Sequence, residues 1–457
     1  MEILSESARQ TRVNRVVIEA LGRGGQTEHV GTTAAEFEKI GFWLRKNLRT
    51  ERIGVIVDAR TRPIAEASVL PIIGETGIGI EIFEVPDLDA GATPICSTDV
   101  GERCARAFRS SPDAILSVGS GTLTDIAKLA SRTLDVPCIA VATAASMNGF
   151  SSSLAATLDN GVKLTVKAPT PKAVWALPSI LQAAPAELTA SGLGDLHSKP
   201  ISSADWRLNH LLQGAPWDLP VVEMLTQVTE LMRGVAAGLQ RNEPSAYAQL
   251  FAGLSLTGIA MQAATPGSQA SGAEHLISHY FDMIAGSGEF GHTATTHGAQ
   301  VAVGCMVSLS AWRFALEAFQ TGRPLGDCPS YVYDPEARDA WIRGHFKSLS
   351  PTLQAMHHKA PKREADVMQR RARLAATRGE ALLDASQQLP DQAWLQNELT
   401  LAGCPFRFSS IGISRALAED CLRFAPWVRA RYTILHLLME CGWYDAFIET
   451  ALDECVG

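Results

Sequence analysis

Short apolar runs alternate with helical stretches between about residues 50 and 176. The runs are RIGVIVDAR (52–60), IGIEIFEV (78–85), AILSVGSGT (114–122), CIAVATAAS (138–146) and AVWAL (173–177). Runs of this length that are apolar on both faces are typical of strands in a parallel sheet covered by helices. The pattern therefore predicts an α/β architecture for the first half of the chain.

From about residue 178 the strand signals stop and apolar residues recur every three or four positions, which is the helical period. The segments with this period are 221–242, 246–264, 298–320 and 362–383. Two breaks rich in Pro and Gly, at 265–272 and 321–330, are predicted to be loops. We therefore expect an α/β domain over residues 1–177 and an all-helical domain over residues 178–457.

The charge and the cysteines narrow the class of protein. The 457 residues contain 40 Lys and Arg against 48 Asp and Glu, a net charge of −8, so there is no basic field for nucleic acid. Nine cysteines without a CxxC pair indicate reduced thiols. The polar start of the chain lacks the apolar core of a signal peptide, and no run of about 18 apolar residues predicts a membrane span. A cytoplasmic protein with a small-molecule substrate is expected.

A glycine turn, Gly119-Ser120-Gly121, lies directly after one predicted strand and directly before a helix. Glycines there let the backbone approach a pyrophosphate, and the helix N-terminus offers free N–H groups. A plain tight turn is the alternative. The next strand ends in the small, hydroxyl-bearing segment 143–146, which should lie beside this turn because ligands bind at the carboxyl ends of strands.

Asp58 ends another predicted strand. A carboxylate in that place can accept hydrogen bonds from both ribose hydroxyls and repels a 2′-phosphate, which favours NAD over NADP. The alternative is that Asp58 caps a helix or forms a turn.

The second half carries one acidic and three imidazole candidates for a metal site. Asp195 follows a glycine pair at the apparent beginning of a helix, His275 and His279 lie four apart on one helix face, and His297 precedes an apolar helix. One carboxylate and two or three imidazoles can hold a divalent metal with an open position. A hydrogen-bonded surface pair of histidines is the alternative.

Together these segments resemble the sn-glycerol-1-phosphate dehydrogenases, in particular their bacterial branch that accompanies arabinose genes. That group belongs to the superfamily of iron-containing alcohol dehydrogenases, glycerol dehydrogenases and dehydroquinate synthases. The resemblance is densest in VGSGTLTD, TAASMNGFSS, KAPTPKAVWA, ASGLGDLHSK, ADWRLNHLL, SGAEHLISHYFDM and HGAQVAVG, and it resumes in SRALAEDCLRFAPWVRARYTILHLL. It implies a Rossmann-like domain followed by an all-α domain, the dehydroquinate synthase-like fold.

The resemblance also implies a reaction and its residues. The reaction is reversible hydride transfer between NAD, less readily NADP, and C2 of dihydroxyacetone phosphate, with one divalent zinc, nickel or iron ion as Lewis acid. The implied dinucleotide contacts are Asp58, Gly119, Gly121, Thr122, Leu123, Thr124, Asp125, Thr143, Ala144, Ala145, Ser146 and Ser152. The implied metal ligands are Asp195, His275 and His297. The implied catalytic residues are His279, Asn148 and Asp195, and the substrate contacts are these three with Lys163.

Two positions depart from the family pattern. Asn148 stands where the motif has a substrate-contacting aspartate, and Ala299 removes a carboxylate near the metal helix. An asparagine can hydrogen-bond a hydroxyl but cannot act as a base. The first alternative is therefore a dehydrogenase of another polyol or phosphorylated ketose, and the second is a silent binding protein of the same fold. Candidate phosphate-binding cations are Lys163, Lys167 and Arg207. Apolar helices of the second half make a homodimer plausible.

Overall fold

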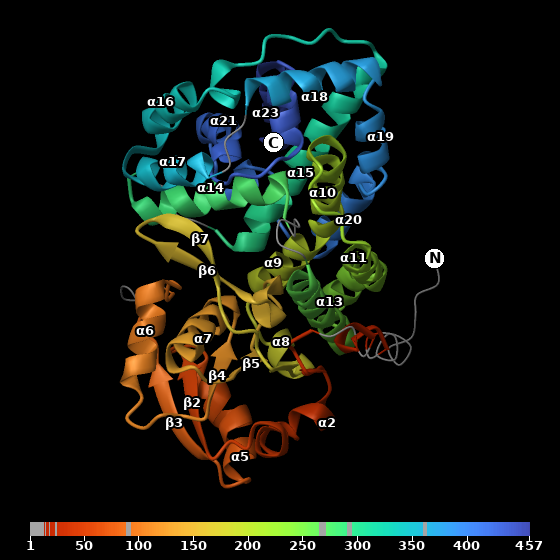
Figure 1. The fold of residues 1–457 in the computed structure, drawn as a ribbon. Helices are drawn as coiled ribbons and strands as arrows, with labels where there is room; N and C mark the ends of the chain where they lie inside the picture. Colours follow the sequence, from red (N-terminus) through yellow and green to blue (C-terminus); the bar gives the residue numbers. More distant parts are fainter. Residues whose placement is uncertain are drawn as a thin grey trace.

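The computed structural model describes residues 13, 15–17, 19–22, 25–87, 93–264, 271–289, 295–359 and 363–457. A sheet flanked by helices forms one end of the molecule, and a larger helical assembly forms the other (Figure 1). The chain passes from one to the other after residue 176, where the last sheet strand ends. The predicted domain boundary at 177 thus falls between a strand and a helix.

The sheet has six parallel strands in the order β1-β8-β5-β4-β2-β3. Their bounds are β1 (His29–Gly31), β2 (Arg52–Val57), β3 (Gly79–Glu84), β4 (Ala114–Gly119), β5 (Cys138–Ala142) and β8 (Ala173–Ala176). All five predicted runs form strands, which confirms the α/β expectation. The three-residue strand β1 was not predicted because it is too short to show an apolar pattern.

The strand β3 departs from the expected burial on both faces. Its ends are exposed and its four central residues are half-buried, because it is the edge strand and pairs only with β2 among the described residues. The neighbouring β2 is buried from Ile53 to Val57. Along β2 the side chains alternate, with Ile53 and Val55 in one core and Ile56 in another, so helices cover both faces of the sheet.

Two groups of helices provide these covers. One face carries α2 (Ala34–Phe37), α3 (Ile40–Trp43), the π-helical segments η1 (Leu44–Leu48) and η2 (Ala65–Val69), α4 (Arg62–Ile64) and α5 (Leu70–Gly74). The other face carries α6 (Thr98–Ala107) and α7 (Gly121–Leu134). The amino end of α7 therefore lies at the carboxyl end of β4, where the sequence predicted a glycine turn.

An antiparallel hairpin that the sequence did not predict lies between the two parts of the molecule (Figure 1). It consists of β6 (Leu154–Asp159) and β7 (Val162–Lys167), and the left-handed pair Asn160 and Gly161 forms its turn. β6 packs against α7, and β7 packs against α14 (Ala273–Ser287) of the helical part. Its strands are half-buried, so their apolar signal is weak.

Helices make up all the regular structure described after residue 177. They are α8 (Pro178–Gln182), α9 (Ala186–His197), α10 (Lys199–Gln213), α11 (Leu219–Leu231), α12 (Val235–Gln240), α13 (Pro244–Ala263), α14, α15 (His297–Gln320), α16 (Pro335–Phe346), α17 (Ser350–His358), α18 (Glu364–Ala376), α19 (Glu380–Ser386), α20 (Gln392–Leu401), α21 (Arg415–Phe424), α22 (Ile434–Glu440) and α23 (Tyr444–Cys455). Short 3₁₀ turns are η3 (Asn148–Ser151), η4 (Ser330–Val332), η5 (Lys347–Leu349), η6 (Ser409–Ile411) and η7 (Ala425–Trp427). The all-helical expectation is confirmed.

One helical segment differs from the sequence pattern. The sequence has one helical period over residues 221–242, but the structure has two helices there, α11 and α12. The chain is divided because Gly234 between them adopts a left-handed conformation with φ of 80°. The predicted loop at 321–330 contains no helix until η4 begins at its last residue. Of the predicted loop at 265–272, residues 265–270 lie outside the described part of the chain.

The helix α15 is long and apolar enough to cross a membrane, but 83% of its apolar window is buried inside the protein. It packs against α9, α14 and α23. A helix that is apolar all round and surrounded by other helices is a core helix. α15 is therefore the centre of the helical part.

Candidate metal and dinucleotide site

Three predicted metal ligands meet from three different helices. Asp195 comes from α9, His275 from α14 and His297 from the first position of α15, and their candidate ligand atoms all lie within 4.8 Å of one another. Asp195 and His275 are buried and His297 is half-buried. The predicted ligands thus form one cluster with the composition of a catalytic metal site.

Glycines let these helices approach backbone to backbone. A Cβ added to Gly298 would lie 1.7 Å from the carbonyl oxygen of Ser191, and one added to Gly304 would lie 2.3 Å from that of Glu274. A Cβ on Gly194 would lie 2.4 Å from the carbonyl oxygen of Gly298. No side chain fits at these distances, so glycines set the spacing that brings the ligands together.

The expectation that Asp195 begins a helix is wrong. Asp195 lies in the last turn of α9, which runs from Ala186 to His197. Gly192 and Gly194 resemble a helix-starting turn in the sequence, but they are interior positions at which another backbone approaches. The position matters because the next helix, α10, begins at Lys199, one helical turn after Asp195.

Both imidazoles present the same ring nitrogen to the cluster. His275 Nδ1 lies 2.8 Å from Glu274 Oε1, while its Nε2 lies 3.5 Å from Asp195 Oδ1. His297 Nδ1 lies 3.0 Å from the hydroxyl of Ser278, which leaves Nε2 available. A hydrogen bond at Nδ1 fixes the tautomer and directs Nε2 toward the position a metal would take.

A second layer of side chains holds Ser278. With its amide nitrogen facing α14, Gln300 donates to Ser278 Oγ at 2.9 Å and to Asp282 Oδ1 at 3.1 Å. Asp282 also forms an ion pair with Lys163 of β7, with 3.1 Å between Nζ and Oδ2. Ala299, where the family motif has a carboxylate, is buried.

The protonation states suit a metal site. Burial disfavours a charged Asp195, but Lys199, whose Nζ lies 3.0 Å from Oδ1, and the hydrogen bond with His275 lower the pKa of that carboxyl well below its usual range. Burial lowers the pKa of His297 to about 4. An ionised carboxylate and neutral imidazoles are the forms that bind a divalent ion, so these residues fit such a group.

His279 and Asn148 border the cluster. The ring of His279 lies 6.0 Å from that of His275 and 6.3 Å from that of His297. Burial, followed by the charge of Arg429, lowers the pKa of His279 well below its usual range, and its buried Nδ1 has no hydrogen-bond partner among the described residues. The Asn148 backbone N–H donates to Asp195 Oδ2 at 2.9 Å. The implied catalytic residues His279 and Asn148 therefore both lie next to the metal cluster.

The glycine turn has the geometry predicted for a phosphate contact. Gly119 ends β4, Gly121 begins α7, and Ser120 makes no side-chain hydrogen bond that would cap the helix. The first N–H groups of α7 are thus available to a ligand. Thr143 donates its backbone N–H to the carbonyl of Gly119 at 3.1 Å, so the segment 143–146 lies beside the turn as expected.

Two implied dinucleotide contacts use their side chains within the protein. Asp125 pairs with the buried Lys128 at 3.0 Å and accepts the backbone N–H of Ala156 at 3.0 Å. The hydroxyl of Ser152 donates to the carbonyl of Leu154 at 2.9 Å. These contacts anchor β6 to α7.

Asp58 follows β2 and forms a turn. Its Oδ1 accepts the backbone N–H groups of Arg60 at 3.0 Å and Thr61 at 2.8 Å. Arg60 Nε lies 3.3 Å from Oδ2. These contacts are the ones expected if Asp58 forms a turn. They also hold its carboxylate at the carboxyl end of β2.

Comparison with known proteins assigns the family. Residues 34–185 match the family described as iron-containing alcohol dehydrogenase. The glycerol-1-phosphate dehydrogenase [NAD(P)+] of Geobacillus thermodenitrificans is 30% identical over 338 residues, which is 72% of each chain. That of Bacillus velezensis is 29% identical over 91% of this chain and 92% of that protein. The chain belongs to the glycerol-1-phosphate dehydrogenase family. It is an NAD(P)-dependent oxidoreductase of the alcohol dehydrogenase type.

Solved structures confirm the fold expected of this family. A probable glycerol dehydrogenase from Sinorhizobium meliloti superposes with a TM-score of 0.57 at 16% identity, covering 94% of this chain and 98% of that one. Glycerol dehydrogenase from Schizosaccharomyces pombe superposes with a TM-score of 0.57 at 12% identity, covering 93% and 91%.

Sequence reasoning missed three residues around the site of this family member: Lys199, Glu274 and Arg429. Lys199 had a signal, because a Lys four residues after an Asp on a helix is placed to pair with it. Glu274 directly precedes His275, but adjacent helix positions do not normally face each other, so no sequence pattern pairs them. Arg429 lies 150 residues after His279 in the chain, so no local sequence pattern connects the two.

Of the three candidate phosphate-binding cations, Lys163 lies at the site. It pairs with Asp282 of α14, the helix that carries His275 and His279. Arg207 instead makes two hydrogen bonds to Asp384 of α19, at 2.6 and 3.1 Å. Lys167 ends β7 and is exposed.

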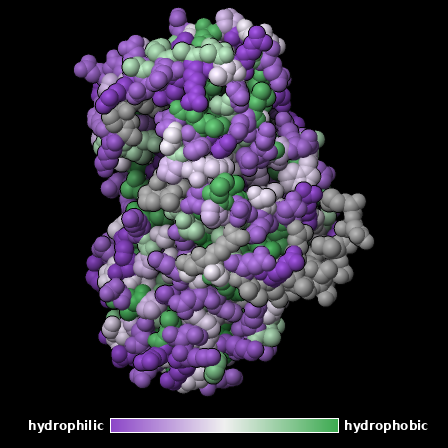
Figure 2. All heavy atoms as spheres, turned by 45° about the vertical axis from the view of Figure 1, so that its right-hand side comes forward, coloured by the Kyte–Doolittle hydropathy of each residue, from purple (hydrophilic) through white to green (hydrophobic). Residues whose placement is uncertain are grey.

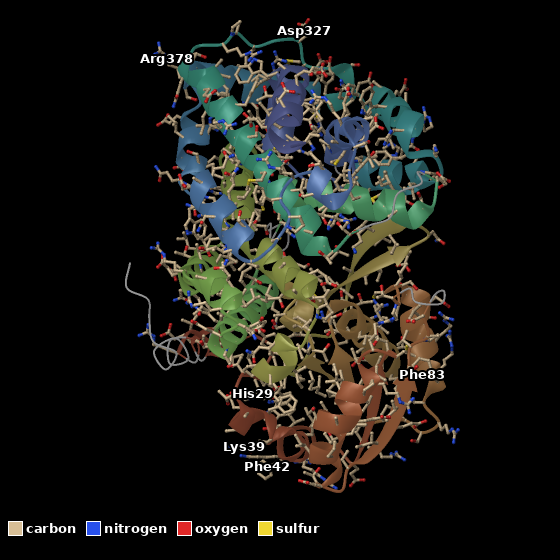
Figure 3. All side chains as sticks on the ribbon, turned by 180° about the vertical axis from the view of Figure 1, so that it is seen from behind. His29, Lys39, Phe42, Phe83, Asp327 and Arg378 are labelled. Atoms are coloured by element: carbon tan, nitrogen blue, oxygen red, sulfur yellow. The ribbon has the colours of Figure 1, made fainter. Side chains whose placement is uncertain are left out.

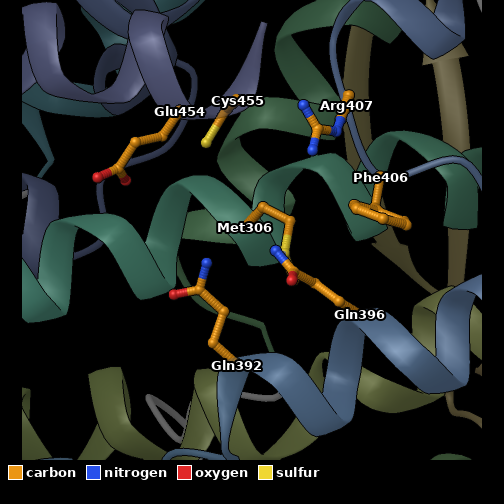
Figure 4. Close-up of a pocket in the computed structure, with 7 residues that line it drawn as sticks. All are labelled: Met306, Gln392, Gln396, Phe406, Arg407, Glu454 and Cys455. Carbon is orange, nitrogen blue, oxygen red and sulfur yellow. The ribbon is translucent and has the colours of Figure 1, made fainter. Parts of the chain in front are cut away.

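A small pocket elsewhere has different chemistry (Figure 4). It lies where α15, α20 and α23 meet and is lined by Met306, Gln392, Gln396, Phe406, Arg407, Glu454 and Cys455. Two of these residues are joined through Arg313, which donates to Gln392 at 2.9 Å and to Glu454 at 2.5 Å. None of the predicted site residues lines it, so it is separate from the metal cluster.

Proposed function

We propose that the chain is an NAD-linked, metal-dependent dehydrogenase that interconverts dihydroxyacetone phosphate and sn-glycerol 1-phosphate. The observation that carries the proposal is the convergence of Asp195, His275 and His297 on one point, with His279 beside them. The name shared by the relatives supports the substrate.

In this proposal Asp195, His275 and His297 hold one zinc, nickel or iron ion through a carboxylate oxygen and two Nε2 atoms. When bound, the ion supplies Lewis acidity at the substrate oxygen and the nicotinamide supplies the hydride. The surrounding residues orient the substrate and handle its proton.

We assign proton transfer to and from the substrate oxygen to His279. Its imidazole is neutral at pH 7 and one of its nitrogens has no partner among the residues described, so it can donate to or accept from a substrate oxygen. Asn148, which is held by its backbone N–H on Asp195, offers an amide to a substrate hydroxyl without acting as a base.

The dinucleotide is assigned to the carboxyl edge of the sheet. The uncapped start of α7 would hold the pyrophosphate, with the remaining implied contacts in the first turn of α7 and in the segment 143–146. Asp58 would accept the ribose hydroxyls and disfavour a 2′-phosphate, so NAD is preferred to NADP. We place the enzyme in the cytoplasm as a homodimer or higher homo-oligomer.

A dehydrogenase of another polyol or ketose is the second candidate, because Asn148 replaces an aspartate of the family motif. One panel separates the two. NADH oxidation is followed with dihydroxyacetone phosphate, free dihydroxyacetone and larger ketoses, and metal is measured in the same sample. We expect about one divalent ion per chain and turnover of dihydroxyacetone phosphate. Turnover of free ketoses alone would select the second candidate, and neither metal nor NADH binding would indicate a silent protein.

A further inference from the structure

Arg429 is a half-buried cation, and one nitrogen of its guanidinium is buried and unsatisfied. It lies between η7 and α22, and its Nη2 is buried without a hydrogen-bond partner in the part of the chain that the structure describes. Burial lowers the pKa of its guanidinium to about 10. Burying a charge is costly unless it is paired and hydrogen-bonded, so a donor left open in this way indicates that a partner is missing.

The position of Arg429 places this donor beside the candidate site. The turn η7 packs against α14, which carries His275, His279 and Asp282. The charge of Arg429 is close enough to lower the pKa of His279, and the charge of Asp282 acts in turn on Arg429. The guanidinium thus belongs to the surroundings of the residue that borders the metal cluster.

The neighbouring charges already have partners. Asp282 is occupied by Lys163 and Gln300. Lys199 pairs with Asp195. No acidic side chain within ion-pairing distance of Arg429 is found among the described residues, which leaves its positive charge in excess.

A second arginine of the same segment shows the contrast. Arg431 donates to the carbonyl oxygen and hydroxyl of Ser271, and it lies in the field of Glu274 and Asp205. Burial together with the charge of Glu274 raises the pKa of Asp205 to about 8, so Asp205 is largely neutral at pH 7. Arg431 thus has two partners on its Nη1, whereas the buried Nη2 of Arg429 has none among the described residues.

We propose that Arg429, together with Lys163, whose partner Asp282 also faces Arg429 electrostatically, forms the anion subsite that receives the phosphate of the substrate, and that this subsite selects phosphorylated substrates over free polyols. The inference rests on the proposed function, which places the reacting end of the substrate at the metal cluster and His279. A guanidinium offers a planar fork of donors that matches phosphate oxygens, and its charge-assisted hydrogen bonds are stronger than those between neutral groups. An anion would complete the hydrogen bonding of Nη2 and offset the excess charge.

The test measures phosphate binding apart from turnover. Titration calorimetry measures the affinity for inorganic phosphate and for sn-glycerol 1-phosphate. The proteins compared are the metal-loaded full chain and its variants Arg429→Gln and Arg429→Lys. Loss of a buried charge-assisted partner should weaken binding of each at least about 30-fold in Arg429→Gln. Arg429→Lys should recover part of it, because it keeps the charge but loses the fork. Arg106→Gln, an exposed arginine on α6 paired with Glu102, is the matched control and should bind as the unaltered protein does.

The kinetic arm separates selection from folding. Arg429→Gln should raise KM for dihydroxyacetone phosphate while its metal content and NADH affinity stay within about twofold of the unaltered protein, which would show that the variant is folded. Unchanged phosphate binding in Arg429→Gln, or a larger loss in Arg207→Gln, would overturn the inference. If the unaltered protein reduces no phosphorylated ketose but binds phosphate through Arg429, the proposed function fails and the anion subsite stands.

Discussion

His275 contacts carboxylates through both ring nitrogens. Glu274 Oε1 lies 2.8 Å from Nδ1 and also accepts the backbone N–H of Gly272 at 2.7 Å, so its position is fixed. The side chain of Glu274 is fully buried. This carboxylate holds the proton on Nδ1 and keeps Nε2 directed at the metal position, as the outer partners of metal-binding imidazoles do.

We predict that Glu274→Gln weakens metal retention without removing a ligand. The amide keeps the shape but loses the charge that fixes the tautomer of His275, and a change of this kind costs about 10- to 100-fold in metal affinity. Competition with a chelator, followed by elemental analysis of the protein, measures the affinity.

The matched control is Glu398→Gln. Glu398 is also a buried glutamate near a histidine, with Oε2 3.9 Å from His197 Nε2. Burial raises the pKa of Glu398 and lowers that of His197 to about 4, so a neutral side chain suits this place. Equal metal affinity in the two variants would contradict the role assigned to Glu274.

The candidate metal ligands could be predicted from the sequence, but only some of the residues that surround them could. Asp195, His275 and His297 could be named because their side chains are unusual in apolar helices and because the chain resembles a known family. Glu274 and Arg429 could not, since one is adjacent to its partner and the other is distant from the site in sequence. A buried atom without a partner is visible only once the fold is known.

The helices α9, α14 and α15 are packed so closely that glycines form their contact. The nearest approach is at Gly298, in the first turn of α15, next to His297. A methyl group there would overlap the carbonyl of Ser191 and separate α15 from α9. The ligand from α15 would move with it.

We predict that Gly298→Ala destabilises the protein by about 3 kcal/mol and lowers metal content, because overpacking at a contact that cannot relax costs this much and displaces His297. Gly344→Ala in α16 is the control, since nothing lies within 4 Å of its added Cβ. That change should stabilise by about 0.5–1 kcal/mol through helix propensity. Denaturant unfolding of both variants, with metal analysis, decides the matter; normal metal content in Gly298→Ala would refute the packing argument.

The elements that the sequence failed to predict share a physical cause. The strand β1 has three residues, and β6 and β7 are half-buried, so none has a long apolar pattern. The beginning of α9 was misplaced because glycines that serve close packing look the same in a sequence as glycines that start a helix. Long buried elements such as β4, β5 and α15 were predicted because burial requires an uninterrupted apolar pattern.

Across the whole molecule, one core joins the two parts. Ala140 and Val174 of the sheet share it with Phe251 and Leu254 of α13. The far ends carry no part of the site: Phe42 is exposed at the sheet end, and Asp327 and Arg378 lie at the helical end (Figure 3). The face in Figure 2 is mostly hydrophilic with small separate apolar patches. The predicted homo-oligomer stays a prediction.

We predict that a chelator lowers the unfolding midpoint of the whole protein. A metal held by α9, α14 and α15 stabilises the folded state, by about 2.7 kcal/mol at a concentration 100 times its Kd. Differential scanning calorimetry with and without chelator should show a lower midpoint that returns on adding zinc. His275→Ala should not respond to the chelator, and an equal response in that variant would argue against a site at these residues.

The contacts of Gly194, Gly298 and Gly304 also bear on how such an enzyme can diverge. Where backbone meets backbone there is no side chain to exchange, so substitution cannot adjust the metal geometry in small steps. Two of the residues assigned to the substrate, Asn148 and Arg429, instead lie in or beside short turns that pack onto these helices. New substrates are therefore expected to arise by changing the turns around an invariant helical frame, and Asn148 is the kind of replacement that this division permits.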